Sequence, residues 1–194
     1  MNCPLPFKQI ALLLQVCILL TAGCATSQSF DAGDTFDTSF QPTGEIVFSG
    51  PRRRTGAAFD GRRVVGPGLN VHRNGDGSWS GFLQGRAVQL TWSPGRLDGA
   101  SLSLAVEQGE AGLELRGHWS AQRSSEQIYL RVSAEDFFAR GATGTPSVFL
   151  KRKGPGRYGG EFNGDYEVQL RGDALLPRPP EPQFALALLG AIGG

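Results

Sequence analysis

The sequence contains few of the residues that usually mark a metal site or a nucleophile. Its 194 residues include only three cysteines, two histidines and one methionine. Neither His72 nor His118 stands at a metal-ligand spacing to another histidine or cysteine. The sequence also lacks the Gly-x-Ser-x-Gly elbow of many hydrolases and a glycine-rich phosphate loop set between a strand and a helix. We therefore expect no catalytic constellation, no metal and no cofactor.

An excess of charge of either sign is also absent. The chain has 19 basic and 18 acidic residues. Lys8 is the only charged residue before Cys24, so the remainder carries 18 of each sign. Nucleic-acid-binding proteins normally present a basic stripe or domain. The balance of charge therefore argues against a nucleic-acid partner.

Long hydrophobic runs are missing except near the start. Lys8 precedes an apolar run from Ile10 to Leu20, which is too short to span a bilayer as a helix. A basic residue, an apolar run of this length and then small residues are typical of a secretory signal peptide. We expect residues 1–23 to be such a signal.

The residues that end this run are more specific. The sequence Leu20-Thr21-Ala22-Gly23-Cys24 resembles the lipobox of bacterial lipoproteins, with Thr21 at a position where an aliphatic residue is commoner. The resemblance implies cleavage before Cys24 and attachment of two or three acyl chains, palmitate among them, to that residue. One chain holds a protein only weakly at a membrane, whereas two or more anchor it stably. Ala25 follows the cysteine, and in this family an aspartate there favours the inner membrane, so the resemblance implies the outer membrane of a diderm cell.

Loss of residues 1–23 would leave Cys24 as the only cysteine, so no intramolecular disulfide could form. The folded part must then be held together by burial alone. Residues 24–44 are rich in Ser, Thr, Asp and Gly without a sustained period, and they predict a flexible, lipid-anchored tether.

From residue 45 to residue 176 the pattern is that of an antiparallel sheet. Apolar residues fall at every second position in several runs, for example 88–92, 102–106 and 128–132. Because neighbouring side chains of a strand point to opposite faces, each run has one buried and one wet side, as in antiparallel sheets. Turn-forming sequences such as Asn74-Gly75-Asp76-Gly77 separate the runs. We predict an all-β domain, a meander of about nine or ten strands.

Two closures of this meander stay open. The many glycines within strands favour bending into a small barrel, and a β-sandwich is the alternative. Residues 177–194 form a proline-rich linker followed by an apolar tail. The tail is too short to span a membrane as a helix. We expect it to pack on the β domain, as a short helix over an open end or as a last strand, with the membrane interface as a third alternative.

Three tryptophans remain as weak candidates for ligand binding: Trp79, Trp92 and Trp119. Trp92 and Trp119 fall in register with the leucines and valines of their own strands, which favours the core. The run Arg52-Arg53-Arg54 is either a solvated edge or a contact for acidic lipid head groups or surface polysaccharide. Glu135 and Asp136 are adjacent carboxylates, and they favour a turn over acid–base chemistry.

The sequence thus favours an exported, lipid-anchored envelope protein with a structural or interaction role and no catalysis. Its partners would be the membrane, through the acyl chains on Cys24, and an envelope protein or polysaccharide. The alternative is a lipocalin-like carrier that binds a small apolar ligand inside the barrel. A cavity lined by Trp79, Leu104, Leu115 and Leu130 would favour the carrier, and a solid core would oppose it.

Overall fold

The computed structural model describes residues 40–193, except for 52, 110–111, 122–123, 142–146, 161–164 and 177–178. The chain separates into two units, residues 1–37 and 38–194, and the described structure belongs to the second. The predicted signal peptide, Cys24 and nearly all of the predicted tether lie outside the described residues.

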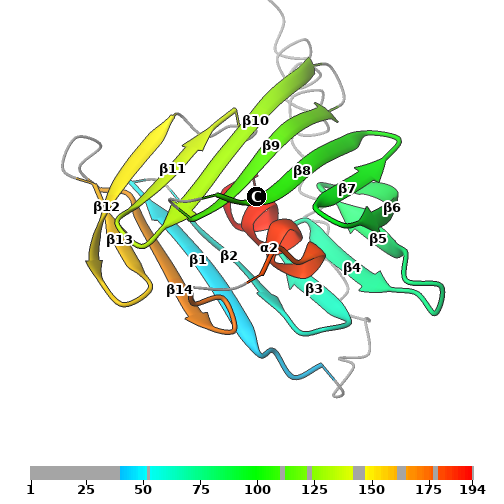
Figure 1. The fold of residues 1–194 in the computed structure, drawn as a ribbon, viewed down its shortest axis with the longest axis horizontal. Helices are drawn as coiled ribbons and strands as arrows, with labels where there is room; N and C mark the ends of the chain where they lie inside the picture. The colour runs from blue at the N-terminus through cyan, green and yellow to red at the C-terminus, as the bar shows by residue number, and fades with distance from the viewer. Residues whose placement is uncertain are drawn as a thin grey trace, which may run out of the picture. The chain divides into compact units, whose positions relative to one another are not determined.

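The described chain folds as one closed antiparallel β-barrel with a single helix (Figure 1). Each strand pairs with the next along the chain, and the first pairs with the last: Gly44 lies opposite Gly172, and Phe48 opposite Val168. The elements are β1 (Gly44–Gly50), β2 (Arg53–Phe59), β3 (Arg63–Gly66), β4 (Leu69–Arg73), β5 (Trp79–Leu83), β6 (Arg86–Ser93), β7 (Arg96–Gly99), β8 (Leu102–Gly109), β9 (Gly112–Ala121), β10 (Ser124–Ser133), β11 (Asp136–Arg140), β12 (Val148–Gly154), β13 (Arg157–Gly159), β14 (Glu167–Gly172) and α2 (Pro182–Gly193).

The barrel confirms the predicted all-β meander and selects a barrel over a sandwich. The described residues form 14 strands, more than the nine or ten expected. The additional strands are short, such as β3, β7 and β13, with three or four residues each. A segment of that length has room for only one or two buried positions, so it shows no alternation that a sequence pattern could reveal.

Alternation decides which face of each strand points inward. In β6, for example, Val88 and Leu90 are buried, whereas Ala87, Gln89 and Thr91 are exposed. The inward residues of all strands join one apolar core. A closed ring leaves no unpaired strand edge, so the sheet offers no edge for pairing with another chain.

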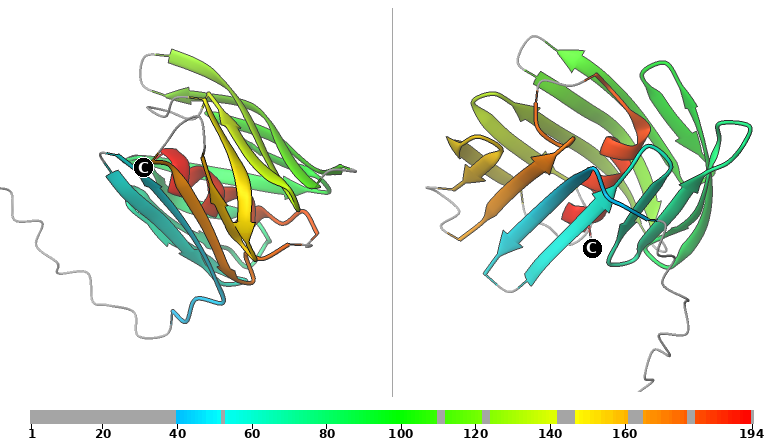
Figure 2. Two further views of the ribbon diagram at one scale, coloured as in Figure 1. Left: turned by 90° about the vertical axis from the view of Figure 1, so that its left-hand side faces the viewer. Right: turned by 90° about the horizontal axis from the view of Figure 1, so that it is seen from below.

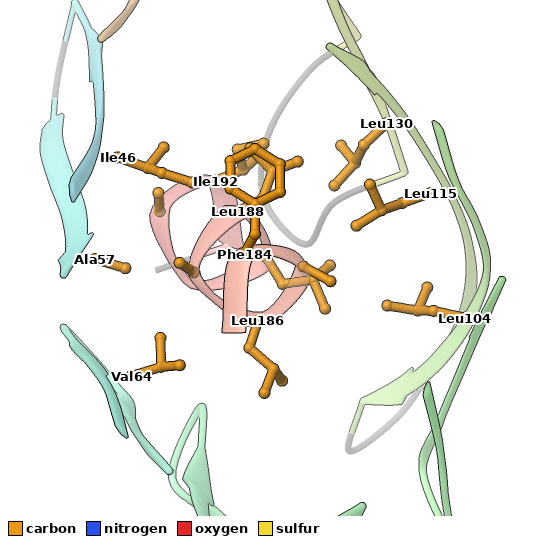
Figure 3. Packing of buried hydrophobic residues seen from close by; sticks show 14 of the residues in the cluster. Ile46, Ala57, Val64, Leu104, Leu115, Leu130, Phe184, Leu186, Leu188 and Ile192 are labelled. Carbon is orange, nitrogen blue, oxygen red and sulfur yellow. The ribbon is translucent and has the colours of Figure 1, made fainter. Parts of the chain in front are cut away.

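The interior of the barrel is occupied by helix α2. Barrel diameter grows with strand number, and eight strands are about the size that inward side chains can fill alone. A 14-stranded ring is wider and needs additional filling. An α-helix with its side chains measures about 10–12 Å across. Figure 3 shows α2 with Ile46, Ala57 and Val64 on one side and Leu104, Leu115 and Leu130 on the other.

The composition of α2 explains its position. All nine residues from Phe184 to Ile192 are buried, and the eight other than Gly190 are each at most 1% exposed. A helix that is apolar on every side belongs in a core, because it has no face to present to water. Alanine and leucine favour helix, and Pro182 is tolerated as the first helical residue. The tail is therefore a helix packed on the domain, as expected, but it lies inside the barrel and not over its end.

Helix α2 runs beside β2 in the opposite direction. The rings of Phe184 and Phe59 meet edge to face, with centroids 6.3 Å apart. At the other end, Arg53 and Thr55 contact the carbonyls of Ile192 and Ala191. Two further views show the helix enclosed by strands (Figure 2). The approach is close: a Cβ on Gly190 would lie 2.3 Å from Leu69 Cδ2.

Candidate functional site

The C-terminal end of α2 is held by polar side chains from the barrel wall. The last carbonyl groups of a helix have no partner within the helix. Here Arg53 Nη2 donates to Ile192 O at 2.6 Å, and Thr55 Oγ1 and Gln84 Nε2 donate to the carbonyls of Ala191 and Gly193. The positive guanidinium also suits the negative end of the helix dipole. These three contacts fix the helix along its axis.

Gln84 is in an unusual backbone conformation at this end of the barrel. Its backbone φ is +49°, in the left-handed region that residues other than glycine seldom adopt. The residue occupies the turn between β5 and β6, where its backbone N–H donates to Gly68 O at 2.5 Å. The strained turn therefore places an amide side chain on the helix terminus.

This arrangement changes the interpretation of the basic run at residues 52–54. Arg53 shares the inward face of β2 with Thr55 and Ala57, and its guanidinium also lies over the Phe48 ring, 5.6 Å from the centroid. The Arg53 guanidinium is thus bound at the C-terminal end of α2, inside one end of the barrel. Arg54 is exposed on the opposite face, and Arg52 lies outside the described residues.

The three tryptophans divide between core and margin. Trp79 and Trp119 are 1% and 3% exposed and belong to the core. Trp92 is half-buried and packs against that core. Trp79, Leu104, Leu115 and Leu130 belong to the same packed cluster as the residues of α2. These residues therefore pack with the chain's own helix, which is the arrangement that opposes the carrier.

The remaining polar motifs form turns and surface contacts. Asp76 accepts hydrogen bonds from the amide and the hydroxyl of Ser78, at 2.9 and 2.7 Å, which lower the pKa of Asp76. Both histidines are exposed, and His72 contacts Ser80 at 3.3 Å. Within the described residues there is no group of three or more His, Cys, Asp or Glu side chains placed to hold a metal ion.

Glu135 and Asp136 lie at the turn between β10 and β11. Ser133 Oγ accepts from both of their amides, at 3.1 and 2.8 Å, and donates to Asp136 Oδ1 at 2.9 Å. Asp136 also pairs with Arg131 at 3.1 Å. The Asp136 carboxylate therefore has structural partners, and Glu135 is held in the turn through its backbone, as the turn position predicted.

The outer surface of β9–β12 carries a different set of side chains, which we call the outer aromatic face. It consists of Tyr129, Phe138 and Phe149 on three adjacent strands, with basic residues between them. The rings of Tyr129 and Phe138 are 5.6 Å apart, and Phe138 lies directly opposite Phe149 in the sheet. All three are half-buried on the side of the wall that faces away from α2.

Basic side chains pack on these rings. The Arg116 guanidinium lies 5.2 Å from the centre of the Tyr129 ring, and Lys151 Nζ lies 4.7 Å from that of Phe149. Such cations are attracted by the negative face of an aromatic ring. Arg116 also pairs with Glu114, and this hydrogen bond raises the pKa of Arg116. Arg140 lies directly opposite Tyr129 in the sheet.

A hollow of about 1100 Å³ opens beside this face. Its side chains include aromatic, basic and uncharged polar groups but no carboxylate among the described residues: Arg116, His118, Gln127, Tyr129, Phe138, Arg140 and Ser147. The hollow is thus basic and aromatic. It is the candidate site of this protein for a partner outside the barrel.

Sequence reasoning missed the outer aromatic face, although a signal was present. In Gln127-Ile128-Tyr129-Leu130-Arg131, Tyr129 falls on the polar phase of the alternation, between two buried residues. Phe138 stands in the same relation to Phe137 and Ala139. Aromatic residues at wet positions are a reason to expect a binding surface.

No family model matches this sequence, and no curated protein or solved structure matches it either. Within the described residues, no helix is both long enough and apolar enough to cross a membrane. The functional argument therefore depends on the site and on the sequence motifs.

Proposed function

We propose that this protein is an exported envelope lipoprotein, anchored through acyl chains on Cys24, with an interaction role and no catalytic activity. The observation that carries the interaction role is the filled barrel. Because α2 occupies the interior, the surface available to a partner is the outside of the barrel. The hollow beside the outer aromatic face supports this role, since it brings basic and aromatic side chains together in a recess of about 1100 Å³.

The anchor is supported by the resemblance of residues 20–24 to a lipobox. In a diderm host we place the protein at the outer membrane, because Ala25 follows the cysteine. The test is membrane fractionation of the Cys24→Ser variant, with mass spectrometry of the mature N-terminus. The variant should appear in the soluble fraction, and the unaltered protein should carry acyl chains on residue 24.

Cys17→Ser is the matched control, because it makes the same chemical change inside the expected signal. It should leave membrane attachment unchanged. Retention of Cys24→Ser in the membrane, or an unmodified thiol at residue 24, would contradict the anchor.

A carrier is the second candidate, and the apolar inner wall favours it. If α2 left the barrel, the surface around Leu104, Leu115 and Leu130 would suit a small apolar ligand. The filled interior opposes this alternative, since a ligand would have to displace nine buried residues. Saturable binding of a fluorescent fatty acid by the intact protein would favour the carrier over the interaction role.

A further inference from the structure

We propose that the hollow beside the outer aromatic face binds an acidic oligosaccharide, a chain of sugar rings that carry carboxylate groups. This inference depends on the proposed function, because export places the protein where such polymers occur at cell surfaces. It adds the chemical class of the partner and the residues that would bind it.

The rings provide surfaces for sugars. The face of an aromatic ring carries negative charge, which attracts the weakly positive C–H groups on the flat side of a pyranose. Tyr129 and Phe138, with centroids 5.6 Å apart and ring planes inclined by 51°, form two adjacent aromatic surfaces in the wall of the hollow. A hollow of about 1100 Å³ can accept more than one sugar ring.

The arginines provide the preference for acidic sugars. Guanidinium groups bind carboxylates through two parallel hydrogen bonds. Arg140 lines the hollow and has no ion pair among the described residues. Arg116 is already held over Tyr129, and its side chain is 61% exposed. A sugar carboxylate beside Tyr129 would therefore lie between Arg140 on one neighbouring strand and Arg116 on the other, and Arg116 would exchange its pairing with Glu114 for the ligand.

The shape and composition of the site disfavour other partners. A bilayer surface requires protruding side chains, whereas these residues line a recess. A wholly apolar ligand would bury the Arg140 guanidinium without a counter-charge, which is costly. Single-stranded nucleic acid also uses basic and aromatic grooves, but the chain as a whole has no basic excess.

The experiment is calorimetric titration of the full mature chain, residues 24–194, in a neutral detergent at pH 7. The probe is tetragalacturonate, and the matched control is its methyl ester, which has the same rings without the charges. We expect saturable binding of the acid, weakened at least about tenfold for the ester, because the charge-assisted hydrogen bonds are lost.

Variants then locate the binding site. Arg116→Gln and Arg140→Gln should each weaken binding of tetragalacturonate about tenfold or more. Phe138→Leu keeps an apolar side chain and removes the ring, and it should weaken binding several-fold. Arg54→Gln is the control, since Arg54 is exposed on β2, away from this face. Thermal melting of each variant checks that it folds.

Several results would overturn the proposal: no saturable binding of tetragalacturonate, equal binding of acid and ester, or equal binding by Arg54→Gln and the two site variants. Binding to phosphatidylglycerol vesicles or to oligothymidylate in preference to the sugar would also overturn it. The comparison of acid and ester needs no variant, so it stays decisive if a substitution prevents folding. Membrane fractionation of Cys24→Ser is independent of sugar binding, so failure of the anchor can be told from failure of this site.

Discussion

Two pairs of arginine and aromatic ring in this barrel have similar geometry and different consequences. Arg53 lies 5.6 Å from the centre of the Phe48 ring, and Arg116 lies 5.2 Å from that of Tyr129. Arg53 faces inward, and its guanidinium donates to a helix carbonyl. Arg116 faces outward and borders an open hollow. Each guanidinium also has a polar partner in the chain, Ile192 O for Arg53 and Glu114 for Arg116. The comparison teaches that the cation–ring contact alone does not identify a binding site; whether the guanidinium borders an open recess does.

Deletion of helix α2, which fills the barrel, should have the largest effect on stability. A chain that ends after Leu176 would lack α2, and with it nine buried residues of the core. We expect the barrel to lose its cooperative thermal transition by circular dichroism, because a 14-stranded ring without α2 has a large empty interior.

Addition of a synthetic peptide of residues 182–193 should restore part of the transition. A truncated protein that melts as cooperatively as the intact chain, and at the same temperature, would show that the helix is not part of the core. Such a result would strengthen the carrier alternative.

A single truncation inside α2 should have the next largest effect. Leu186 is fully buried, and Leu186→Ala removes its contacts and leaves a cavity. We expect a loss of about 2–5 kcal/mol in the free energy of unfolding. Leu175→Ala is the matched control outside the core, since Leu175 is 42% exposed, and it should change stability by less than about 0.5 kcal/mol. Urea denaturation measures both.

The inward environment of Arg53 can be tested against the outward environment of its neighbour Arg54. Arg53→Met keeps the length of the side chain and removes the donor to Ile192 O. It should reduce the free energy of unfolding by about 1–3 kcal/mol, because a buried carbonyl loses its partner. Arg54→Met, on the exposed face, should be nearly neutral. Equal effects of the two substitutions in urea denaturation would refute a specific role for Arg53.

Removal of the Tyr158 hydroxyl from the barrel wall should have the smallest effect on stability. Tyr158 donates to Ser133 O at 2.8 Å, and burial raises the pKa of Tyr158. A raised pKa in the folded state means that its stabilisation is complete below the unfolded value near 10 and is lost as the pH rises through the folded value.

Tyr158→Phe should cost about 1 kcal/mol at pH 8. Above pH 10, the stability of the unaltered protein should fall more steeply than that of the variant. Denaturation at pH 8 and at pH 11 measures the difference. Parallel loss of stability in both proteins would show that another group is responsible.

The fold was accessible from the sequence because alternation in strands is a local signal. The runs around Leu90, Leu104 and Leu130 predicted antiparallel strands, and each is a strand with those residues inward. The composition of the apolar tail at residues 184–192 favours packing on the β domain over the membrane interface. Its place inside the barrel was not accessible, because it depends on the width of the closed ring and hence on strands too short to recognise.

The candidate site was less accessible than the fold. Tyr129 and Phe138 come from neighbouring strands, and Arg116 comes from a third, so their proximity depends on register. Alternation places these residues on the outer face but does not align them. The tryptophans were candidates as large aromatic residues, but Trp79 and Trp119 belong to the core.

The closure of the ring has a consequence for how the chain is made. Strand β1 is completed by β14, and β2 packs against α2, the last element of the chain. Strands β1 and β2 can pair with each other early, but β1 obtains its second neighbour and β2 its cover only when β14 and α2 have been made. Until residues 182–193 have been made, the barrel lacks the helix that fills it, so the core is completed only at the end of synthesis.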